Sequence, residues 1–190
     1  MARLTLPKTL EVGTITGSSH DDLFLRVFER HRGETDTART FVCQWNGEAF
    51  TLVRRFEHQL ADLAIDGEGA LHALGKHGEY DVYRGGQWAP KHAGIPGLTT
   101  QLRLLPSGTY ALGWGAVHRF DGGAWTRLEV GGDEAMVFDL LEVDDALVVC
   151  GSDGLLGRLD GSRHFHPVAT GTPVNLTRLT QHEGRLLVCG

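Results

Sequence analysis

Ser18, Ser19, His20, Asp21 and Asp22 stand together near the start of the chain, and they are the residue types of a hydrolytic triad. The members of a triad are brought together by the fold from distant positions, so adjacency along the chain does not indicate one. The sequence also lacks the Gly-x-Ser-x-Gly pattern of a nucleophile elbow. We interpret the segment as a polar turn in front of a strand.

His164 and His166 are two residues apart, a spacing that places both side chains on one face of a strand and could begin a metal site. The sequence offers no third ligand, and we expect both histidines at a solvated edge. We therefore predict no catalytic residue, no metal site and no cofactor.

An internal repeat of about 38 residues supplies the framework for these side chains. Four segments end alike in glycine, and these glycines are 38, 38 and 39 residues apart: Gly75, Gly113, Gly151 and Gly190. A turn that precedes an aromatic residue keeps the same period, and the aromatic residues are Phe50, Trp88, Trp125 and Phe165. We expect these four side chains to pack between neighbouring repeats.

Each repeat has the pattern of four short strands. In the second repeat we expect strands at residues 60–65, 70–74 and 79–83 and from residue 87 onward, with a two-residue hairpin at Gly85-Gly86. The Asn-Gly, Asp-Gly-Gly and Asp-Gly-Ser turns of the other repeats are predicted to share its turn chemistry. Residues 21–30 are expected to form a strand as well.

Four-stranded antiparallel sheets that recur at a period of about 40 residues are typical of a β-propeller, whereas a β-sandwich needs no long-period register. We therefore predict an all-β chain with a single β-propeller domain over residues 1–190. The blades are expected at about residues 8–56, 59–97, 98–134 and 135–174, with a partial blade at 175–190. The ring of about four and a half blades could be closed to five by a strand at residues 2–6, could belong to a larger propeller, or could be completed by a second chain.

The hairpin Asp121-Gly122-Gly123-Ala124-Trp125 resembles the Asp-box of sialidase-type and photosystem-assembly-type propeller blades. It lacks the leading Ser or Thr of the Asp-box, and Arg84 replaces the aspartate in the second repeat. Over most of residues 41–190 the chain is similar to bacterial β-propeller repeat proteins with degenerate Asp-box or WD-repeat-like blades. This resemblance implies a propeller fold and carries no activity over, because propellers host many unrelated functions.

The composition restricts the partners and the compartment. With a net charge of −6, the chain has no electrostatic case for binding nucleic acid or an anionic membrane. Three cysteines without CxxC spacing suit a reducing cytoplasm, and we expect Cys150 and Cys189 to be buried. No apolar run is long enough for a secretory signal or a membrane span, so we predict a cytoplasmic location. Arginine supplies 15 of the 18 basic residues, which favours a bacterial source.

In a propeller, the loops between the second and third strands of each blade and the loops between consecutive blades share one face. We call this face the loop face, and here it is predicted to carry Lys76, His77, Lys91, His92, Trp114, Asp133, Glu134, Ser152 and Asp153. Trp114 stands where the neighbouring repeats have Lys76 and Ser152, and an aromatic side chain in a loop is a candidate anchor for a partner. Mixed charges around one large aromatic ring suit a protein surface.

We therefore expect a non-enzymatic scaffold that binds another protein through its loop face, as an adaptor, an assembly factor or a toxin-immunity-type partner. One alternative is a glycan-directed hydrolase or lyase with its site at the mouth of the channel, against which the short chain and the lack of an export signal weigh. The other alternative is a half-propeller that functions only after self-association closes the ring.

Overall fold

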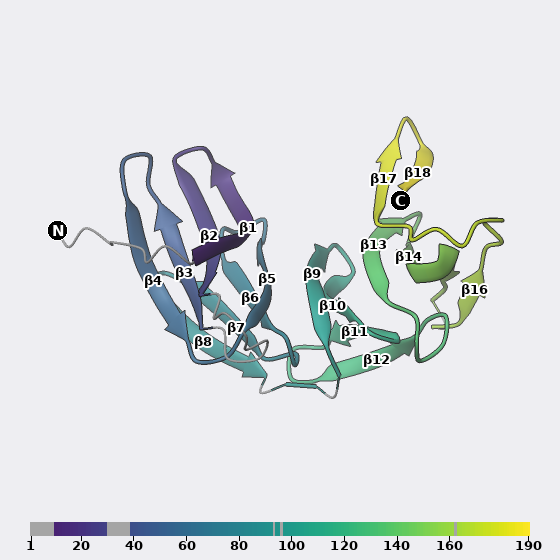
Figure 1. The fold of residues 1–190 in the computed structure, drawn as a ribbon, viewed down its shortest axis with the longest axis horizontal. Helices are drawn as coiled ribbons and strands as arrows, with labels where there is room; N and C mark the ends of the chain where they lie inside the picture. Colours follow the sequence, from purple (N-terminus) through teal and green to yellow (C-terminus); the bar gives the residue numbers. More distant parts are fainter. Residues whose placement is uncertain (1–9, 30–38, 93, 96, 162) are drawn as a thin grey trace. The chain divides into compact units, whose positions relative to one another are not determined.

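The computed structural model describes residues 10–29, 39–92, 94–95, 97–161 and 163–190. Within these residues the regular elements are β-strands, apart from the short 3-10 turn η1 (Ser152–Gly154). The chain divides into two compact units, Met1–Gly94 and Ile95–Gly190, and both are built from antiparallel sheets (Figure 1). None of the described segments forms a helix with the length and apolarity needed to cross a membrane.

The first unit contains two four-stranded sheets whose strands follow one another in chain order. The first sheet consists of β1 (Leu10–Ser19), β2 (Asp22–Glu29), β3 (Thr40–Trp45) and β4 (Phe50–Phe56). The second consists of β5 (Leu60–Ile65), β6 (Leu71–Gly75), β7 (Tyr80–Arg84) and β8 (Gln87–His92). The strand predicted at residues 21–30 is confirmed as β2, and the strands of the second repeat begin within one residue of their predicted positions.

The second unit contains two more four-stranded sheets and a final pair of strands. The first sheet consists of β9 (Thr99–Leu105), β10 (Gly108–Gly113), β11 (Ala116–Phe120) and β12 (Trp125–Glu129). The next consists of β13 (Val137–Val143), β14 (Ala146–Gly151), β15 (Leu156–Leu159) and β16 (Phe165–Pro167), and the pair of β17 (Arg178–His182) and β18 (Arg185–Cys189). The all-β architecture of about four and a half antiparallel blades is therefore confirmed. The closing strand expected at residues 2–6 lies outside the described residues.

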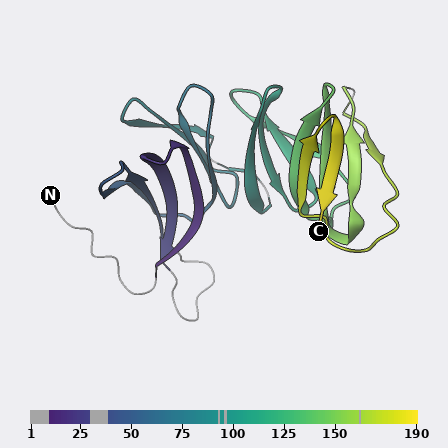
Figure 2. The ribbon, with the colours of Figure 1, turned by 90° about the horizontal axis from the view of Figure 1, so that it is seen from above.

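Apolar side chains join neighbouring sheets within each unit. In the first unit Phe24, Val42 and Phe56 of one sheet share a buried cluster with Leu60, Leu63, Leu71 and Ala73 of the other. In the second unit a larger cluster joins the two four-stranded sheets through Tyr110, Leu112, Val117, Leu128, Val130, Val137, Leu140, Val149 and Leu159. The pair β17–β18, yellow in Figure 2, lies against β13 and β14 through Val148, Cys150, Leu176 and Leu179. Because each sheet buries one face on the next, stacking of repeats supplies the core.

A buried carboxylate links the first strands of consecutive sheets in the second unit. Asp139 on β13 is 3% exposed, and its Oδ1 accepts a hydrogen bond of 2.8 Å from Arg103 Nε on β9. Its Oδ2 accepts a hydrogen bond of 2.8 Å from the Leu179 amide on β17. A buried carboxylate must be paired and hydrogen-bonded to be tolerated, so Asp139 fixes the relative registers of three sheets.

The hairpins between third and fourth strands are closed in two ways. Between β7 and β8, Gly85 (φ 58°) and Gly86 (φ 83°) form the predicted two-residue turn with positive φ at both positions. In the first sheet of each unit the loop has four residues, and Asn46 Oδ1 and Asp121 Oδ1 each accept hydrogen bonds from the amides two and three residues further on. The glycine with positive φ is therefore common to these turns, at Gly47 (φ 88°) and Gly122 (φ 94°) as at Gly85. The longer loops differ in that an Asn or Asp side chain also binds the turn amides.

The four repeated aromatic residues have different surroundings. Trp88 is half-buried, with its ring centroid 5.2 Å from that of Phe56 in the neighbouring sheet, and Phe165 packs against the core of the second unit. Trp125 is half-buried and contacts Phe120 of its own sheet. Phe50 is 49% exposed, contrary to prediction, because β4 is exposed at its start and buried only at its end.

The two repeated cysteines also differ. Cys150 is fully buried, and burial, reinforced by the nearby Asp139 carboxylate, raises the pKa of its thiol to about 12. Cys189 is exposed, contrary to prediction, because β18 is the outer strand of its pair and no other strand in the described part of the chain pairs with it.

The repeated glycine at the end of the second strand is required by a close contact. A Cβ atom on Gly113 would lie 2.0 Å from the carbonyl oxygen of Leu98, and one on Gly151 would lie 2.1 Å from that of Met136. Both carbonyls belong to the residue just before the first strand of the same sheet. Any side chain at the glycine would force the connection between sheets away from the loop.

We expect Gly113→Ala to lower the free energy of unfolding by about 1–3 kcal/mol, because the added methyl overpacks a backbone contact. Gly123→Ala is the matched control, since a Cβ there meets nothing within 4 Å, and it should change stability by no more than about 0.5 kcal/mol. Urea denaturation followed by tryptophan fluorescence compares the two. Equal losses in both variants would contradict the role assigned to the contact.

Candidate functional site

The nine residues predicted on the loop face divide between the two units. Lys76, His77, Lys91 and His92 belong to the first unit. There the Gly94 amide donates to His92 Nδ1 at 3.0 Å, and a Cβ on Gly94 would lie 2.8 Å from the His77 carbonyl oxygen. The loop after β6 and the segment after β8 therefore meet. Lys91 and His92 belong to strand β8 itself and not to the loop between blades, contrary to prediction, because the pairing of β8 with β7 extends to His92.

The other five residues belong to the second unit, where backbone hydrogen bonds hold their loops. The Trp114 amide donates to the Leu98 carbonyl at 3.1 Å. The Ser152 amide donates to the Met136 carbonyl at 2.9 Å. In return, the Ser152 hydroxyl accepts a hydrogen bond of 3.0 Å from the Met136 amide. The glycine before each of these residues makes this approach possible, so the repeat itself positions Trp114 and Ser152.

Trp114 is held in place and yet exposed. Its indole Nε1–H donates to the Glu134 carbonyl at 3.1 Å, and its backbone forms a β-bridge with Met136. The following amide, that of Gly115, donates to the Ala135 carbonyl at 2.7 Å. Its side chain remains 52% exposed. An ordered aromatic side chain loses little conformational entropy when a partner covers it, which makes it an effective binding anchor.

A groove of about 340 Å³ adjoins Trp114 through Glu134. We call it the acidic groove, and its lining consists of Gly131, Glu134, Ala135, Ser152, Asp153, Gly154, Leu155, Leu156, Pro167 and Val168. Its apolar side chains are Ala135, Leu155, Leu156, Pro167 and Val168, and its polar side chains are Glu134, Ser152 and Asp153. Three of the nine predicted residues thus share one groove, with Trp114 beside it.

The loop that carries Asp153 has an unusual backbone. Asp153 (φ 53°, ψ 36°) and Gly154 (φ 73°) are consecutive residues whose backbone lies in the left-handed region. Residues other than glycine rarely adopt this conformation. The loop is tied down by Gly154, whose amide donates to the Val174 carbonyl at 2.9 Å, and by the Asp153 amide, which donates to Asn175 Oδ1 at 3.1 Å. The loop is therefore fixed by its backbone, and the Asp153 carboxylate is left facing the groove.

The carboxylates of this region differ in their partners. Asp133 is 87% exposed at its side chain and forms an ion pair of 2.7 Å with Arg127, which also binds Glu129 at 2.9 Å. Within the described residues the side chains of Glu134 and Asp153 form no hydrogen bond or ion pair. The groove thus presents two uncompensated negative charges.

Sequence reasoning missed the apolar part of the groove. Pro167 and Val168 reach it because β15 and β16 pair with Gly157 opposite Pro167, and the Val168 amide donates to the Leu156 carbonyl at 2.8 Å. The available signal was the antiparallel pairing of third and fourth strands, which places the residues after β16 opposite the start of β15.

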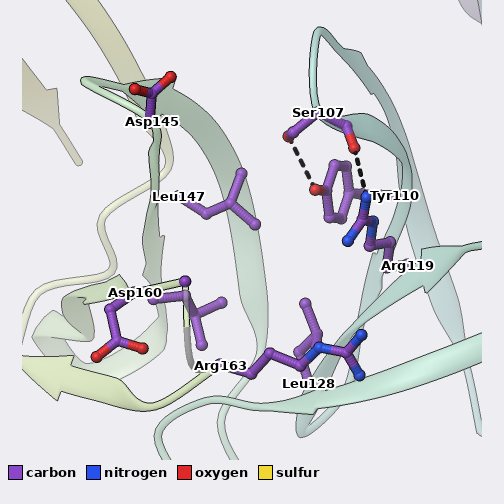
Figure 3. Close-up of a pocket in the computed structure, with 10 residues that line it drawn as sticks. Ser107, Tyr110, Arg119, Leu128, Asp145, Leu147, Asp160 and Arg163 are labelled. Atoms are coloured by element: carbon purple, nitrogen blue, oxygen red, sulfur yellow. Dashed lines mark hydrogen bonds between the residues drawn. The ribbon is translucent and has the colours of Figure 1, made fainter.

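A second pocket, of about 140 Å³, lies at the opposite end of the same sheets, among their turns (Figure 3). Its apolar wall consists of Leu128, Leu147 and Leu159. Figure 3 shows Arg163 reaching across it, whereas the carboxylates of Asp145 and Asp160 point away from one another. Asp160 Oδ2 lies 2.8 Å from His166 Nε2. Glycosidases need two carboxylates on either side of one bond, and this pocket does not present such a pair.

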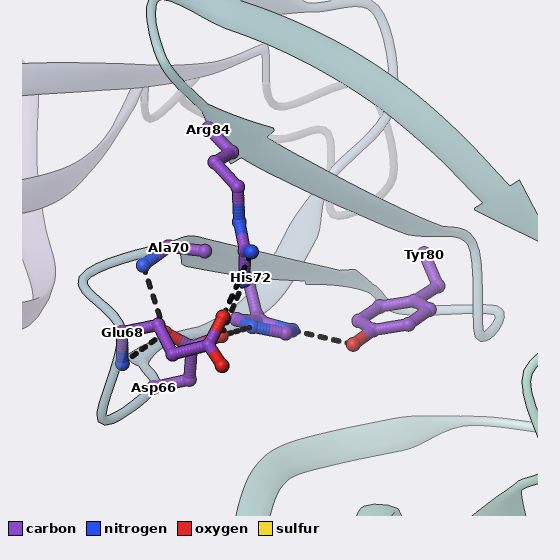
Figure 4. A network of polar contacts seen from close by, with 6 residues as sticks. All are labelled: Asp66, Glu68, Ala70, His72, Tyr80 and Arg84. Carbon is purple, nitrogen blue, oxygen red and sulfur yellow. Dashed lines mark hydrogen bonds and ion pairs between the residues drawn. The ribbon is translucent and has the colours of Figure 1, made fainter.

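In the first unit a polar network joins a turn to two strands (Figure 4). Asp66 Oδ2 lies 3.0 Å from His72 Nε2 and 3.2 Å from the Arg84 guanidinium, and His72 Nδ1 lies 2.5 Å from the Tyr80 hydroxyl. Carboxylate, imidazole and hydroxyl stand in the order of a catalytic relay. Tyr80 is only 2% exposed, however, so its hydroxyl is shielded from a substrate and the network acts as a structural tie.

The two motifs with which the sequence could do chemistry have structural roles. Ser18 and Asp22 flank the hairpin between β1 and β2, with the Ser18 hydroxyl donating to Asp22 at 2.9 Å, so the polar turn is confirmed. The His164 amide donates to Asp160 Oδ1 at 3.1 Å, and both His164 and His166 are exposed. Across the described segments no group of three or more His, Cys, Asp or Glu side chains is arranged to hold a metal ion.

No known protein family and no curated protein sequence matches this chain. Among solved structures it is similar to YCF48, a β-propeller protein, in a structure described as "YCF48 bound to D1 peptide", with a TM-score of 0.65 and 14% sequence identity. The likeness covers 97% of this chain and 61% of that chain, so this chain spans less than two thirds of its structural neighbour. At this identity the likeness shows the fold: the protein is a β-propeller.

Asp66 gives a pH-dependent test of the network in Figure 4. Burial raises the pKa of its carboxyl, but hydrogen bonds from His72 and from the Ala70 and Glu68 amides outweigh burial and hold the pKa below its ordinary value of 3.8. A carboxyl with a lowered pKa stabilises the fold above the unfolded-state pKa, and the stabilisation is lost as the pH falls through the folded-state pKa.

We expect Asp66→Ala to lower the free energy of unfolding at neutral pH by about 1–2 kcal/mol. The difference from the wild type should shrink as the pH falls below 3.8. Urea denaturation at neutral and acidic pH measures both effects, with Glu68→Ala as control because Glu68 is 74% exposed at its side chain and binds the same Arg84. A difference that is unchanged by pH would show that the Asp66 charge is not involved.

Proposed function

We propose that this β-propeller is a non-enzymatic scaffold that binds another protein through the loop face of its second unit. The observation that carries the proposal is Trp114, whose ring is exposed although its indole N–H and backbone are fixed beside the acidic groove. Interface hot spots are enriched in tryptophan, and a fixed ring is already in its bound orientation.

Two further observations support this proposal. A protein of the same fold, YCF48, was solved with a D1 peptide bound, so the fold is compatible with peptide recognition. The residues that line the acidic groove include no histidine, cysteine or lysine, so Ser152 has no imidazole or amine there to activate it as a nucleophile. Adaptor, assembly factor and toxin-immunity partner all remain members of the proposed class.

The proposal predicts that Trp114→Ala weakens binding to the partner by at least about tenfold, the usual effect of truncating a hot-spot residue. The partner would be captured on tagged wild-type protein from the native extract, identified by mass spectrometry and titrated in purified form. Phe50→Ala is the matched control, because Phe50 is 49% exposed, close to the 52% of Trp114, and lies on a hairpin away from the loop face. Equal affinities of the two variants would contradict the proposal. So would turnover of aryl glycosides that is lost in Glu134→Gln.

Ring closure by a second chain is a further candidate, favoured by β18. This outer strand exposes Leu186 (36%) and Leu187 (48%), and apolar side chains on an edge strand invite pairing. Light scattering should then give the mass of a dimer, and Leu187→Lys should return a monomer. A monomeric wild type would exclude this candidate. The single propeller domain over residues 1–190 stays a prediction.

A further inference from the structure

The acidic groove has the chemistry to select the charge of its ligand. Glu134 and Asp153 stand at its edge without a partner in the described part of the chain, and no basic side chain lines it. Asp133, next to Glu134 in the chain, shares the single guanidinium of Arg127 with Glu129, so the surroundings add a further net negative charge. Two exposed carboxylates at one groove attract cations and repel acidic segments.

The apolar side chains that line the groove set a second requirement for its ligand. Leu155, Leu156 and Val168 line it, and Val168 is 51% exposed. At about 340 Å³ it stands at the lower end of ligand pockets, which begin at about 300 Å³. It therefore suits one or two apolar side chains, with the ring of Trp114 beside it as a second apolar contact.

Asp153 adopts a left-handed conformation (φ 53°), which carries some strain for a residue other than glycine. Asp144 and Asp145 share this conformation in the turn between β13 and β14, so the conformation by itself does not mark a binding site. Glycine would relieve the strain but would remove the carboxylate. The sequence already uses glycine at the next position, Gly154, where a Cβ would lie 1.9 Å from the Thr172 carbonyl oxygen.

We infer that the acidic groove binds an extended basic peptide segment of another protein, with an apolar side chain in the groove and Lys or Arg side chains against Glu134 and Asp153. This inference rests on the proposed function and names the chemical class of its ligand. The negative net charge of the whole chain, −6, adds long-range attraction for such a segment.

The test uses the full chain and three synthetic fluorescein-labelled peptides in which Leu alternates with Lys, with Gln or with Glu. Fluorescence anisotropy at low ionic strength should show binding in the order Lys, Gln, Glu. The Lys peptide should lose affinity as salt is added, because salt screens charges over about 10 Å at 0.1 M. Glu134→Gln and Asp153→Asn should each weaken binding of the Lys peptide by about two- to fivefold, as expected for the loss of one exposed charge pair.

Asp144→Asn is the matched control. Asp144 is also an exposed aspartate with positive φ (49°), but it lies in the turn between β13 and β14, at the opposite end of the sheet from Asp153. This variant should bind the Lys peptide as the wild type does. Asp153→Gly separates charge from folding: it should melt no lower than the wild type, because strain is relieved, and should still lose affinity as Asp153→Asn does.

Equal binding of the Lys and Glu peptides, or equal effects of Asp153→Asn and Asp144→Asn, would overturn the inference. If the partner captured from the extract still required Trp114, the proposed function would stand and only the choice of a basic segment would be wrong. If Trp114→Ala also had no effect on that partner, both would fail.

Discussion

The contact between a repeat glycine and the carbonyl that precedes the first strand of its sheet is the constraint on which the rest depends. At Gly113 and Gly151 a Cβ would lie within 2.1 Å of that carbonyl oxygen. Because no side chain intervenes, the next amide, that of Trp114 or Ser152, donates to the same carbonyl. In these two sheets one contact therefore closes the second strand against the start of the first and fixes the position of the next loop residue. The spacing of 38 residues between Gly113 and Gly151 records this contact in the sequence, whereas a Cβ on Gly75 would meet the Glu79 side chain instead.

The side chain presented after the repeated glycine differs from sheet to sheet, because a different residue follows each glycine. Lys76 follows the first glycine, Trp114 the second and Ser152 the third. At the second position the backbone bond leaves an indole ring exposed, with its N–H bound to the Glu134 carbonyl. At the third, the Ser152 hydroxyl accepts a backbone amide, and the chain enters the left-handed turn of Asp153. A uniform backbone framework thus carries individual side chains at one end of the sheets, a common division between scaffold and recognition surface.

The opposite end of the sheets is devoted to turn closure. Asn46, Asp66 and Asp121 each accept amide hydrogen bonds within their own turn. Asp160 does the same and also contacts His166. The side-chain oxygens of these residues accept hydrogen bonds within the fold, whereas those of Glu134 and Asp153 accept none from the described residues. Because the Asp and Asn side chains at the turns already accept hydrogen bonds from the backbone, they form no catalytic arrangement, although their residue types alone would permit one.

The sequence by itself determined the all-β architecture and the strand positions of the second repeat, because the same strand pattern recurs at a fixed period along the chain. It could not distinguish free carboxylates from those used in turns, since both are aspartates beside glycines and only hydrogen-bond geometry separates Asp153 from Asp121. The different fates of Phe50 and Trp88, and of Cys189 and Cys150, follow from which sheet covers each face, and this is decided by packing between repeats. The acidic groove likewise required the tertiary structure. Its walls come from the loop after β12, the loop after β14 and the end of β16, and only the pairing of strands brings these segments together.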